Sequence, residues 1–230
     1  MDRSGLTVSE IFGPTIQGEG PSAGRRAGFV RLGRCNLACS FCDTPYTWDW
    51  TRFDPAQELS RVPAGDLLES VKAMDVPLLV ITGGEPLLQQ RRLLPLLEAV
   101  HRLGIEVEVE TAGTIAPNVP DGLVTRWNVS PKLASSGNSL AARYRPKVLE
   151  AFQATGRAIF KFVVTGPADL EEIEGIVSLS DLEPIWLMPE GTDATAIVNG
   201  MRALAPHVMT RGWHLSPRLH ILIWGDRRGV

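Results

Sequence analysis

Three cysteines, the only ones in this 230-residue chain, fall within eight residues as Cys35, Cys39 and Cys42. A disulfide framework needs an even number of cysteines, usually spread along the chain. Three thiols in one short loop are instead typical of a metal or iron–sulfur site. The segment before them, Gly28–Gly33, is predicted to be a strand, so the thiolates would follow its C-terminal end. In parallel α/β folds, active sites form at that edge of the sheet.

The cysteines leave more than one interpretation open. A structural zinc site needs four ligands, but there is no fourth cysteine, and the histidine nearest in sequence, His101, falls on a predicted helix. Cys39 and Cys42 could form a redox dithiol, but Cys35 would then have no role. Three thiolates can hold three irons of a [4Fe–4S] cluster and leave the fourth iron open to a small-molecule chelator. We favour the cluster.

Short apolar runs alternate with helix-period segments along the chain. Six strands are expected, at Gly28–Gly33, Leu78–Thr82, Ile105–Glu110, Arg126–Ser130, Ala158–Thr165 and Pro184–Met188. Helices are expected at Ala64–Met74, Leu93–Leu103, Pro146–Thr155, Asp169–Leu179 and Asp193–Leu204. This alternation predicts a mostly parallel sheet with right-handed crossovers. Since six repeats are too few for a closed eight-fold barrel, we expect an α/β fold, a truncated open barrel of about six parallel strands, formed by a single domain over residues 1–230.

Composition excludes several classes of protein. The net charge of −3 argues against a general binder of nucleic-acid backbones, which would be basic. There is no apolar run long enough to span a membrane, and Met1–Gly5 lacks the pattern of a signal peptide. We therefore expect a soluble cytoplasmic protein. The polar stretch Pro45–Pro63 is predicted to be a long loop, in which Trp48 and Trp50 are expected to pack rather than to bind.

Two glycine-containing segments stand beside the predicted strands. Thr82-Gly83-Gly84-Glu85-Pro86 follows an apolar run, and Gln17-Gly18-Glu19-Gly20 encloses a carboxylate between glycines. Taken alone, each segment is an ordinary turn. Glycines also let a backbone approach a ligand closely, and a carboxylate can accept hydrogen bonds from an ammonium group.

The cysteine spacing resembles the signature of radical S-adenosylmethionine (SAM) enzymes. Within that superfamily the chain resembles the 7-carboxy-7-deazaguanine synthase family over nearly its whole length. The resemblance rests on Glu10–Phe12, Thr15–Gly20, Gly24-Arg25, Phe29–Leu32, Cys35–Leu37, Cys42–Thr44, Thr82–Pro86, Glu110–Thr114, Ser130–Lys132 and Leu219–Trp224. One departure is Ala112, where the family more often has Asn.

The resemblance implies a carbon–nitrogen lyase of 7-deazapurine (queuosine-type) biosynthesis. Its reaction would be the radical ring contraction of 6-carboxy-5,6,7,8-tetrahydropterin to 7-carboxy-7-deazaguanine, with release of ammonia. The implied cofactors are a [4Fe–4S] cluster, SAM and Mg²⁺. The implied partners are the substrate, an electron donor such as flavodoxin or ferredoxin, and a second copy of the chain in a homodimer.

The resemblance also implies site residues, none of them an acid–base catalyst. The cluster ligands would be Cys35, Cys39 and Cys42, and Thr44 would bind Mg²⁺. SAM would contact Phe41, Cys42, Asp43, Gly84, Glu85, Ser130, Pro131 and Lys132. The substrate would contact Ile16, Gln17, Gly18, Arg31 and Thr82.

Some of these residues have ordinary structural alternatives. Arg31 suits a substrate carboxylate because a guanidinium can donate two parallel hydrogen bonds, but it could also point into water. Lys132 could be a surface charge, and Thr44 could be a helix cap. His101, His207, His214 and His220 show no ligand spacing and are expected to be structural or surface residues.

Two other functions stay open at this point. Another radical SAM enzyme, such as a glycyl-radical-enzyme activase, would share the cysteines and the Gly-Gly-Glu segment. A non-catalytic zinc-binding module would share only the cysteines.

Overall fold

The computed structural model describes residues 5–230; residues 1–4, in the segment that lacks a signal-peptide pattern, lie outside the described residues. Its nine strands form one sheet in the order β3-β1-β2-β4-β5-β6-β7-β8-β9. The strands are β1 (Leu6–Ile16), β2 (Arg26–Leu32), β3 (Ser60–Val62), β4 (Leu78–Gly83), β5 (Glu106–Thr111), β6 (Arg126–Val129), β7 (Ala158–Val164), β8 (Ile185–Pro189) and β9 (His214–Leu215). The α-helices are α1 (Pro55–Glu58), α2 (Ala64–Met74), α3 (Gln90–Arg102), α4 (Leu140–Arg143), α5 (Pro146–Gln153), α6 (Pro167–Ser180), α7 (Ala194–Arg211) and α8 (Leu219–Trp224), and the 3-10 helices are η1 (Gly20–Ser22), η2 (Pro45–Thr47), η3 (Pro86–Gln89) and η4 (Ala134–Ser136).

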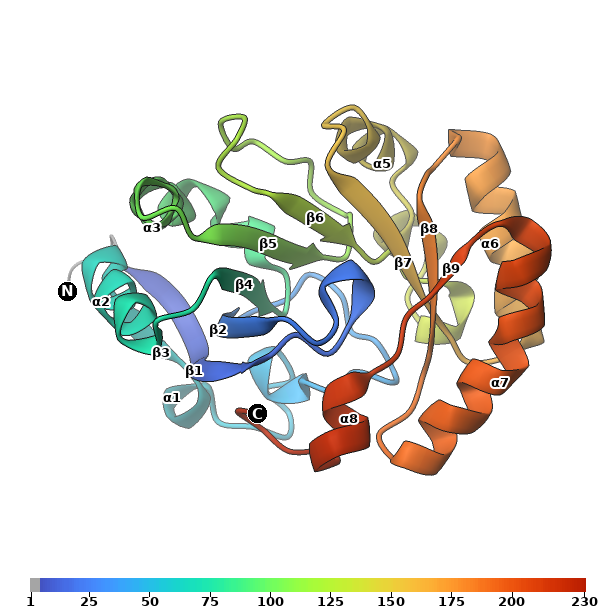
Figure 1. Ribbon diagram of the computed structural model, residues 1–230, viewed down its shortest axis with the longest axis horizontal. Helices are drawn as coiled ribbons and strands as arrows, with labels where there is room; N and C mark the ends of the chain where they lie inside the picture. The colour runs from blue at the N-terminus through green and yellow to red at the C-terminus, as the bar shows by residue number, and fades with distance from the viewer. Residues whose placement is uncertain (1–4) are drawn as a thin grey trace.

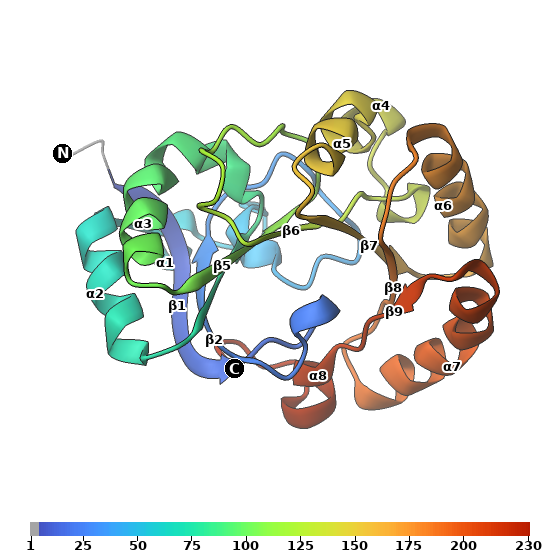
Figure 2. The ribbon, with the colours of Figure 1, turned by 45° about the horizontal axis from the view of Figure 1, so that its top comes forward.

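The sheet is an open barrel. Its strands pair in parallel from β2 through β4 to β9, and β1 is antiparallel to both β2 and β3. Because β3 and β9 are the two ends of the strand order, the sheet does not close. The larger helices lie outside the curved sheet (Figure 1), and in Figure 2 they form an arc around it. The predicted truncated α/β barrel is confirmed.

The period-two pattern of the strands separates the core from the barrel interior. Side chains such as those of Leu79, Val107 and Phe160 point outward into the core shared with the helices. Leu93, Leu96, Leu97 and Val100 supply the buried face of α3. Fully burying one leucine stabilises the fold by about 1.5–3 kcal/mol. The alternate side chains of the same strands face the interior of the barrel and are free to build a site.

All six predicted strands are present, but three strands were not predicted. In β1 the alternation is interrupted by Gly13-Pro14 and by register shifts against β2, so the strand pattern is lost from the sequence. β3 and β9 have three and two residues, too few for a periodic signal. The stretch Pro45–Pro63, predicted to be a loop, contains η2, α1 and β3.

The predicted helices are present with adjusted ends. α2 has the predicted bounds, whereas α7 continues beyond Leu204 and Pro206 to Arg211. The Asp193 side chain accepts a hydrogen bond from the Ala196 amide at its start, and Gly212, with φ of 66°, ends it. Within residues 5–230, no helix is both long and apolar enough to span a membrane.

Candidate active site

Cys35, Cys39 and Cys42 lie in the loop that follows β2, and all three line one cavity of about 230 Å³. None of them forms a disulfide. The loop is held from two directions: the amide of Ser40 donates to the Ser136 carbonyl at 3.0 Å, and the amide of Arg34 donates to the Thr47 carbonyl at 2.6 Å. The three thiols therefore face a common space from a tethered loop, as the sequence predicted.

The chemistry of the three thiols fits an iron–sulfur cluster. Burial raises the pKa of the Cys35 thiol to about 12, and it also raises the pKa of Cys39. Thiolates in this environment need cationic partners, which irons would supply on binding. Within residues 5–230, no three His, Cys, Asp or Glu side chains, the three cysteines included, are gathered closely enough to hold a single metal ion.

Gly83, the last residue of β4, and Gly84 pack this strand end onto the cysteine loop. A Cβ on Gly83 would lie 2.1 Å from the Leu32 carbonyl oxygen, and one on Gly84 would lie 2.2 Å from the Arg34 carbonyl oxygen. The Glu85 amide also donates to the Arg34 carbonyl at 2.9 Å. The close approach that these glycines allow is made to the backbone beside Cys35, and the expected approach to a ligand stays a prediction.

Glu85 is fully buried and its carboxylate is already engaged. It accepts hydrogen bonds from the amides of Leu87 and Ala112 and from the Thr111 hydroxyl. Burial raises its pKa despite these bonds. The carboxylate thus fixes the turn that contains Ala112, and a direct contact from Glu85 to SAM stays a prediction.

Most of the other residues predicted to bind SAM line the same cavity. Phe41, Asp43, Gly84, Ser130 and Lys132 are on its wall, and Pro131 is buried between the last two. Lys132 Nζ donates to Ser130 Oγ at 2.9 Å, so Lys132 is not a freely solvated surface charge.

Thr44 also lines the cavity. It occupies the N-cap position of η2, but its side chain makes no capping hydrogen bond. Its hydroxyl lies 3.8 Å from Cys42 Sγ. The capping alternative therefore does not describe Thr44, and its role in binding Mg²⁺ stays a prediction.

All five residues predicted to bind substrate line this cavity too: Ile16, Gln17, Gly18, Arg31 and Thr82. Glu110 joins two of them, accepting from Gln17 Nε2 at 3.1 Å and from Thr82 Oγ1 at 2.7 Å. Arg31 donates through Nε to Glu10 Oε2 at 2.6 Å, which rules out the alternative that it points freely into water. Burial opposes ionisation of Glu10, but Arg31, Tyr46 and Arg228 together hold its pKa below the ordinary value.

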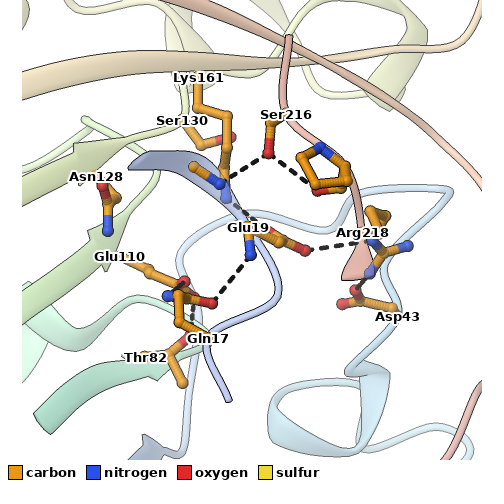
Figure 3. A network of polar contacts seen from close by, with 12 residues as sticks. Gln17, Glu19, Asp43, Thr82, Glu110, Asn128, Ser130, Lys161, Ser216 and Arg218 are labelled. Carbon is orange, nitrogen blue, oxygen red and sulfur yellow. Dashed lines mark hydrogen bonds and ion pairs between the residues drawn. The ribbon is translucent and has the colours of Figure 1, made fainter. Parts of the chain in front are cut away.

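A buried charge network that sequence reasoning missed completes the site. Glu19 forms ion pairs with Lys161 and Arg218, and Arg218 also pairs with Asp43. Figure 3 shows Glu19 between its two cationic partners, near Gln17. Burial opposes the charge on Glu19, yet the two cations hold its pKa well below the usual range.

Signals for two of the missed residues exist in the sequence. Lys161 interrupts the apolar run Ala158–Thr165, and Glu110, which lines the cavity, ends the alternating segment Ile105–Glu110. His220 lies in the segment Leu219–Trp224 that carries part of the family resemblance, but no ligand spacing singles it out. It lies half-buried on α8, lines the cavity, and contacts the position of Gly18.

Comparison with known proteins identifies the family to which the chain belongs. The Radical SAM superfamily model matches residues 30–129. The 7-carboxy-7-deazaguanine synthase of Pyrobaculum aerophilum is 37% identical over 229 residues, which cover 97% of each chain. The chain belongs to the 7-carboxy-7-deazaguanine synthase family. A further synthase, from Halobacterium salinarum, is 34% identical, with 98% of this chain and 93% of that protein covered.

Solved structures agree with this family assignment. The crystal structure of QueE from Escherichia coli superposes with a TM-score of 0.72 at 26% identity, covering 92% of this chain and 93% of that one. Streptococcus suis SuiB, solved bound to S-adenosylmethionine, shares the fold alone, with a TM-score of 0.52 and 15% identity over 79% of this chain and 47% of that one. As a member of the synthase family the chain is a radical SAM enzyme, and neither an activase nor a zinc-binding module is favoured.

Proposed function

We propose that this enzyme converts 6-carboxy-5,6,7,8-tetrahydropterin to 7-carboxy-7-deazaguanine and ammonia. One observation carries the proposal: the three cysteines and the five residues expected to bind substrate line a single cavity at the C-terminal edge of the parallel strands. A radical formed beside the cysteines would therefore arise next to the bound substrate. Family membership at 37% identity supports the same reaction.

We assign the cysteines to a [4Fe–4S] cluster and the neighbouring wall of the cavity to SAM. When bound, the reduced cluster and SAM together supply a carbon-centred radical that abstracts a hydrogen atom from the substrate. The low potential that this requires lies within the range of such clusters, which reaches roughly −700 mV. Ser130 and Lys132 line the cavity on the SAM side. The Arg143 guanidinium donates to the Lys132 carbonyl at 3.1 Å, and the Ala134 amide donates to Glu172 at 2.7 Å, so this segment is held in place from α4 and α6.

We assign Ile16, Gln17, Gly18, Arg31 and Thr82 of the same cavity to the carboxylated pterin. Among residues 5–230, only Glu10 accepts a hydrogen bond from the Arg31 side chain, which donates it through Nε to Glu10 Oε2. The two terminal nitrogens of Arg31 are then available for the substrate carboxylate, in the paired geometry that guanidinium groups favour. Glu10 is itself fixed by the Tyr46 hydroxyl at 2.9 Å. Gln17 and Thr82, both bonded to Glu110, would position the ring system, as a radical rearrangement requires.

We further propose that Thr44 binds Mg²⁺ together with the substrate. Magnesium prefers hard oxygen ligands and keeps several of its waters, so one hydroxyl and substrate oxygens form a suitable shell. The Thr44 hydroxyl makes no capping bond and lines the cavity, which supports the assignment.

The remaining parts of the proposal concern the context in which the enzyme works. Since all nine strands belong to one sheet, we propose a single radical SAM domain over residues 1–230. An electron donor such as flavodoxin or ferredoxin would reduce the cluster. We also propose a homodimer, which sedimentation equilibrium tests, and a cytoplasmic location, where thiols stay reduced.

Anaerobic reconstitution tests the assignment of function. The chain, loaded with iron and sulfide, should be brown and should process SAM when the carboxylated tetrahydropterin and a reductant are supplied. Cys39→Ala is the matched control, which should lose cluster and turnover together. A loaded enzyme that consumes SAM but leaves the pterin unchanged would assign the chain to a different radical SAM reaction. A colourless, zinc-containing protein would exclude radical chemistry altogether.

A further inference from the structure

The sulfur of each of the three cysteines accepts a hydrogen bond from an N–H group. Trp48 Nε1 lies 3.3 Å from Cys42 Sγ, and Asn138 Nδ2 lies 3.3 Å from Cys39 Sγ. The backbone amide of Leu37 lies 3.5 Å from Cys35 Sγ. The Trp48 bond was not predicted, because the sequence favoured a packing role for this residue.

The backbone around Trp48 is tethered, which favours a fixed indole position. The amide of Trp48 donates to the Pro45 carbonyl at 3.0 Å at the end of η2. The carbonyl of the preceding residue, Thr47, accepts from Arg34, next to Cys35. The segment that contains Trp48 is thus hydrogen-bonded to the start of the cysteine loop.

A hydrogen bond to a cluster sulfur changes the reduction potential. One-electron reduction adds negative charge that is shared by the sulfurs, so an N–H donor stabilises the reduced cluster more than the oxidised one. The effect is strengthened by burial, since the cavity wall shields the sulfurs from water. An indole N–H is suited to this use because it donates and cannot accept, and it carries no charge that titrates.

We propose that Trp48 is a positioning residue that raises the reduction potential of the cluster by donating its indole N–H to Cys42 Sγ. This inference rests on the proposed function, because it requires that Cys42 is a ligand of a [4Fe–4S] cluster. It assigns to Trp48 a role in matching the cluster to its electron donor.

Trp48→Phe tests the proposal, because phenylalanine keeps an aromatic ring and removes the N–H. Trp50→Phe is the matched control: Trp50 lies two residues further on, is 39% exposed, and donates no hydrogen bond to a cysteine sulfur in the described chain. The readout is the midpoint potential from an anaerobic titration followed by electron paramagnetic resonance, at matched iron and sulfide content. We expect Trp48→Phe to disfavour reduction about tenfold, equivalent to about 59 mV for one electron. Trp50→Phe should keep the parent potential.

A second measurement covers the case in which Trp48→Phe does not load a cluster. Wild-type protein labelled with ¹⁵N in the indole rings should show a ¹⁵N coupling to the reduced cluster in pulsed resonance spectra. Absence of that coupling, or an unchanged potential in a loaded Trp48→Phe cluster, would overturn the inference and leave the proposed function standing. A wild-type chain that assembles no cluster would overturn both.

Discussion

The imidazole of His220 occupies the space where a side chain on Gly18 would begin. A Cβ on Gly18 would lie 2.1 Å from His220 Nδ1, 2.9 Å from Cγ and 3.0 Å from the His220 amide nitrogen. The Leu219 amide also donates to the Gly18 carbonyl at 2.8 Å. Residues about 200 positions apart thus meet at one wall of the cavity, and the glycine is needed for this contact.

Gly18→Ala should therefore damage the substrate side of the cavity. The added methyl would displace the His220 ring and the backbone beside it, since no real Cβ tolerates a contact of 2.1 Å. We expect the pterin to bind at least tenfold more weakly, measured by calorimetry on cluster-loaded protein. Gly65→Ala is the control: Gly65 lies in the first turn of α2, and a Cβ added there would meet no atom within 4 Å, so alanine should fit and leave binding unchanged. Equal affinities in the two variants would contradict the contact.

Arg31→Lys should weaken substrate binding although the charge is kept. An ammonium cannot donate two parallel hydrogen bonds to a carboxylate while also holding Glu10. Loss of one charge-assisted hydrogen bond should cost about 1.5–3 kcal/mol of substrate binding free energy. Affinity for SAM should not change. The control is Arg25→Lys, which alters an ion pair with Glu106 that lies outside the cavity lining. Parent-like substrate affinity in Arg31→Lys would remove the proposed clamp.

Thr44→Val should blunt the response of the enzyme to Mg²⁺. The substitution keeps the shape of the side chain but removes the hydroxyl that faces the cavity. Turnover of the parent should rise with added Mg²⁺, whereas the variant should respond weakly while keeping its cluster and SAM cleavage. Thr51→Val serves as the control, because Thr51 is exposed and bonds only within its own turn to Asp49. A parent-like Mg²⁺ response in Thr44→Val would reject the metal assignment.

His220 should make stability depend on pH below neutrality. Burial lowers its pKa from 6.5; Glu19, Asp43 and Glu110 oppose the shift, and Arg218 reinforces it. Between the folded pKa and 6.5 the unfolded chain binds more protons, so the free energy of unfolding falls as the pH drops through this window. The slope can reach about 1.4 kcal/mol per pH unit for one proton.

Denaturant titrations between pH 7.5 and 5.5 measure this slope. His220→Gln should flatten the curve, whereas His101→Gln, at an exposed position on α3, should follow the parent. Identical slopes for the parent and His220→Gln would show that this imidazole does not couple to folding.

The sequence predicted the parallel part of the sheet well because local patterns encode it. Strands such as β4 and β7 are apolar, and α3 has a clear helical period. The pattern failed for β1, because its bulges and the Gly13-Pro14 pair hide the alternation. It also failed for the end of α7, where Pro206 suggests a stop that the longer helix accommodates.

The site was predictable where its residues are contiguous in sequence. The cysteine loop and the Gly83-Gly84 segment have recognisable local spacing, and both lie where expected. Lys161 lies on β7, whereas Arg218 and His220 lie at the start of α8, and the open barrel brings all three to Glu19 and Gly18. No periodicity within one segment can show such a contact.

The mass of the product tests the central claim most directly. Cluster-loaded enzyme should be incubated without oxygen with 6-carboxy-5,6,7,8-tetrahydropterin, SAM and reductant, and the mixture analysed by mass spectrometry. The account predicts a product lighter than the substrate by one ammonia, with ammonia released in equal amount and both absent from the Cys39→Ala control. A fully loaded enzyme that reduces SAM but yields no such product would contradict it.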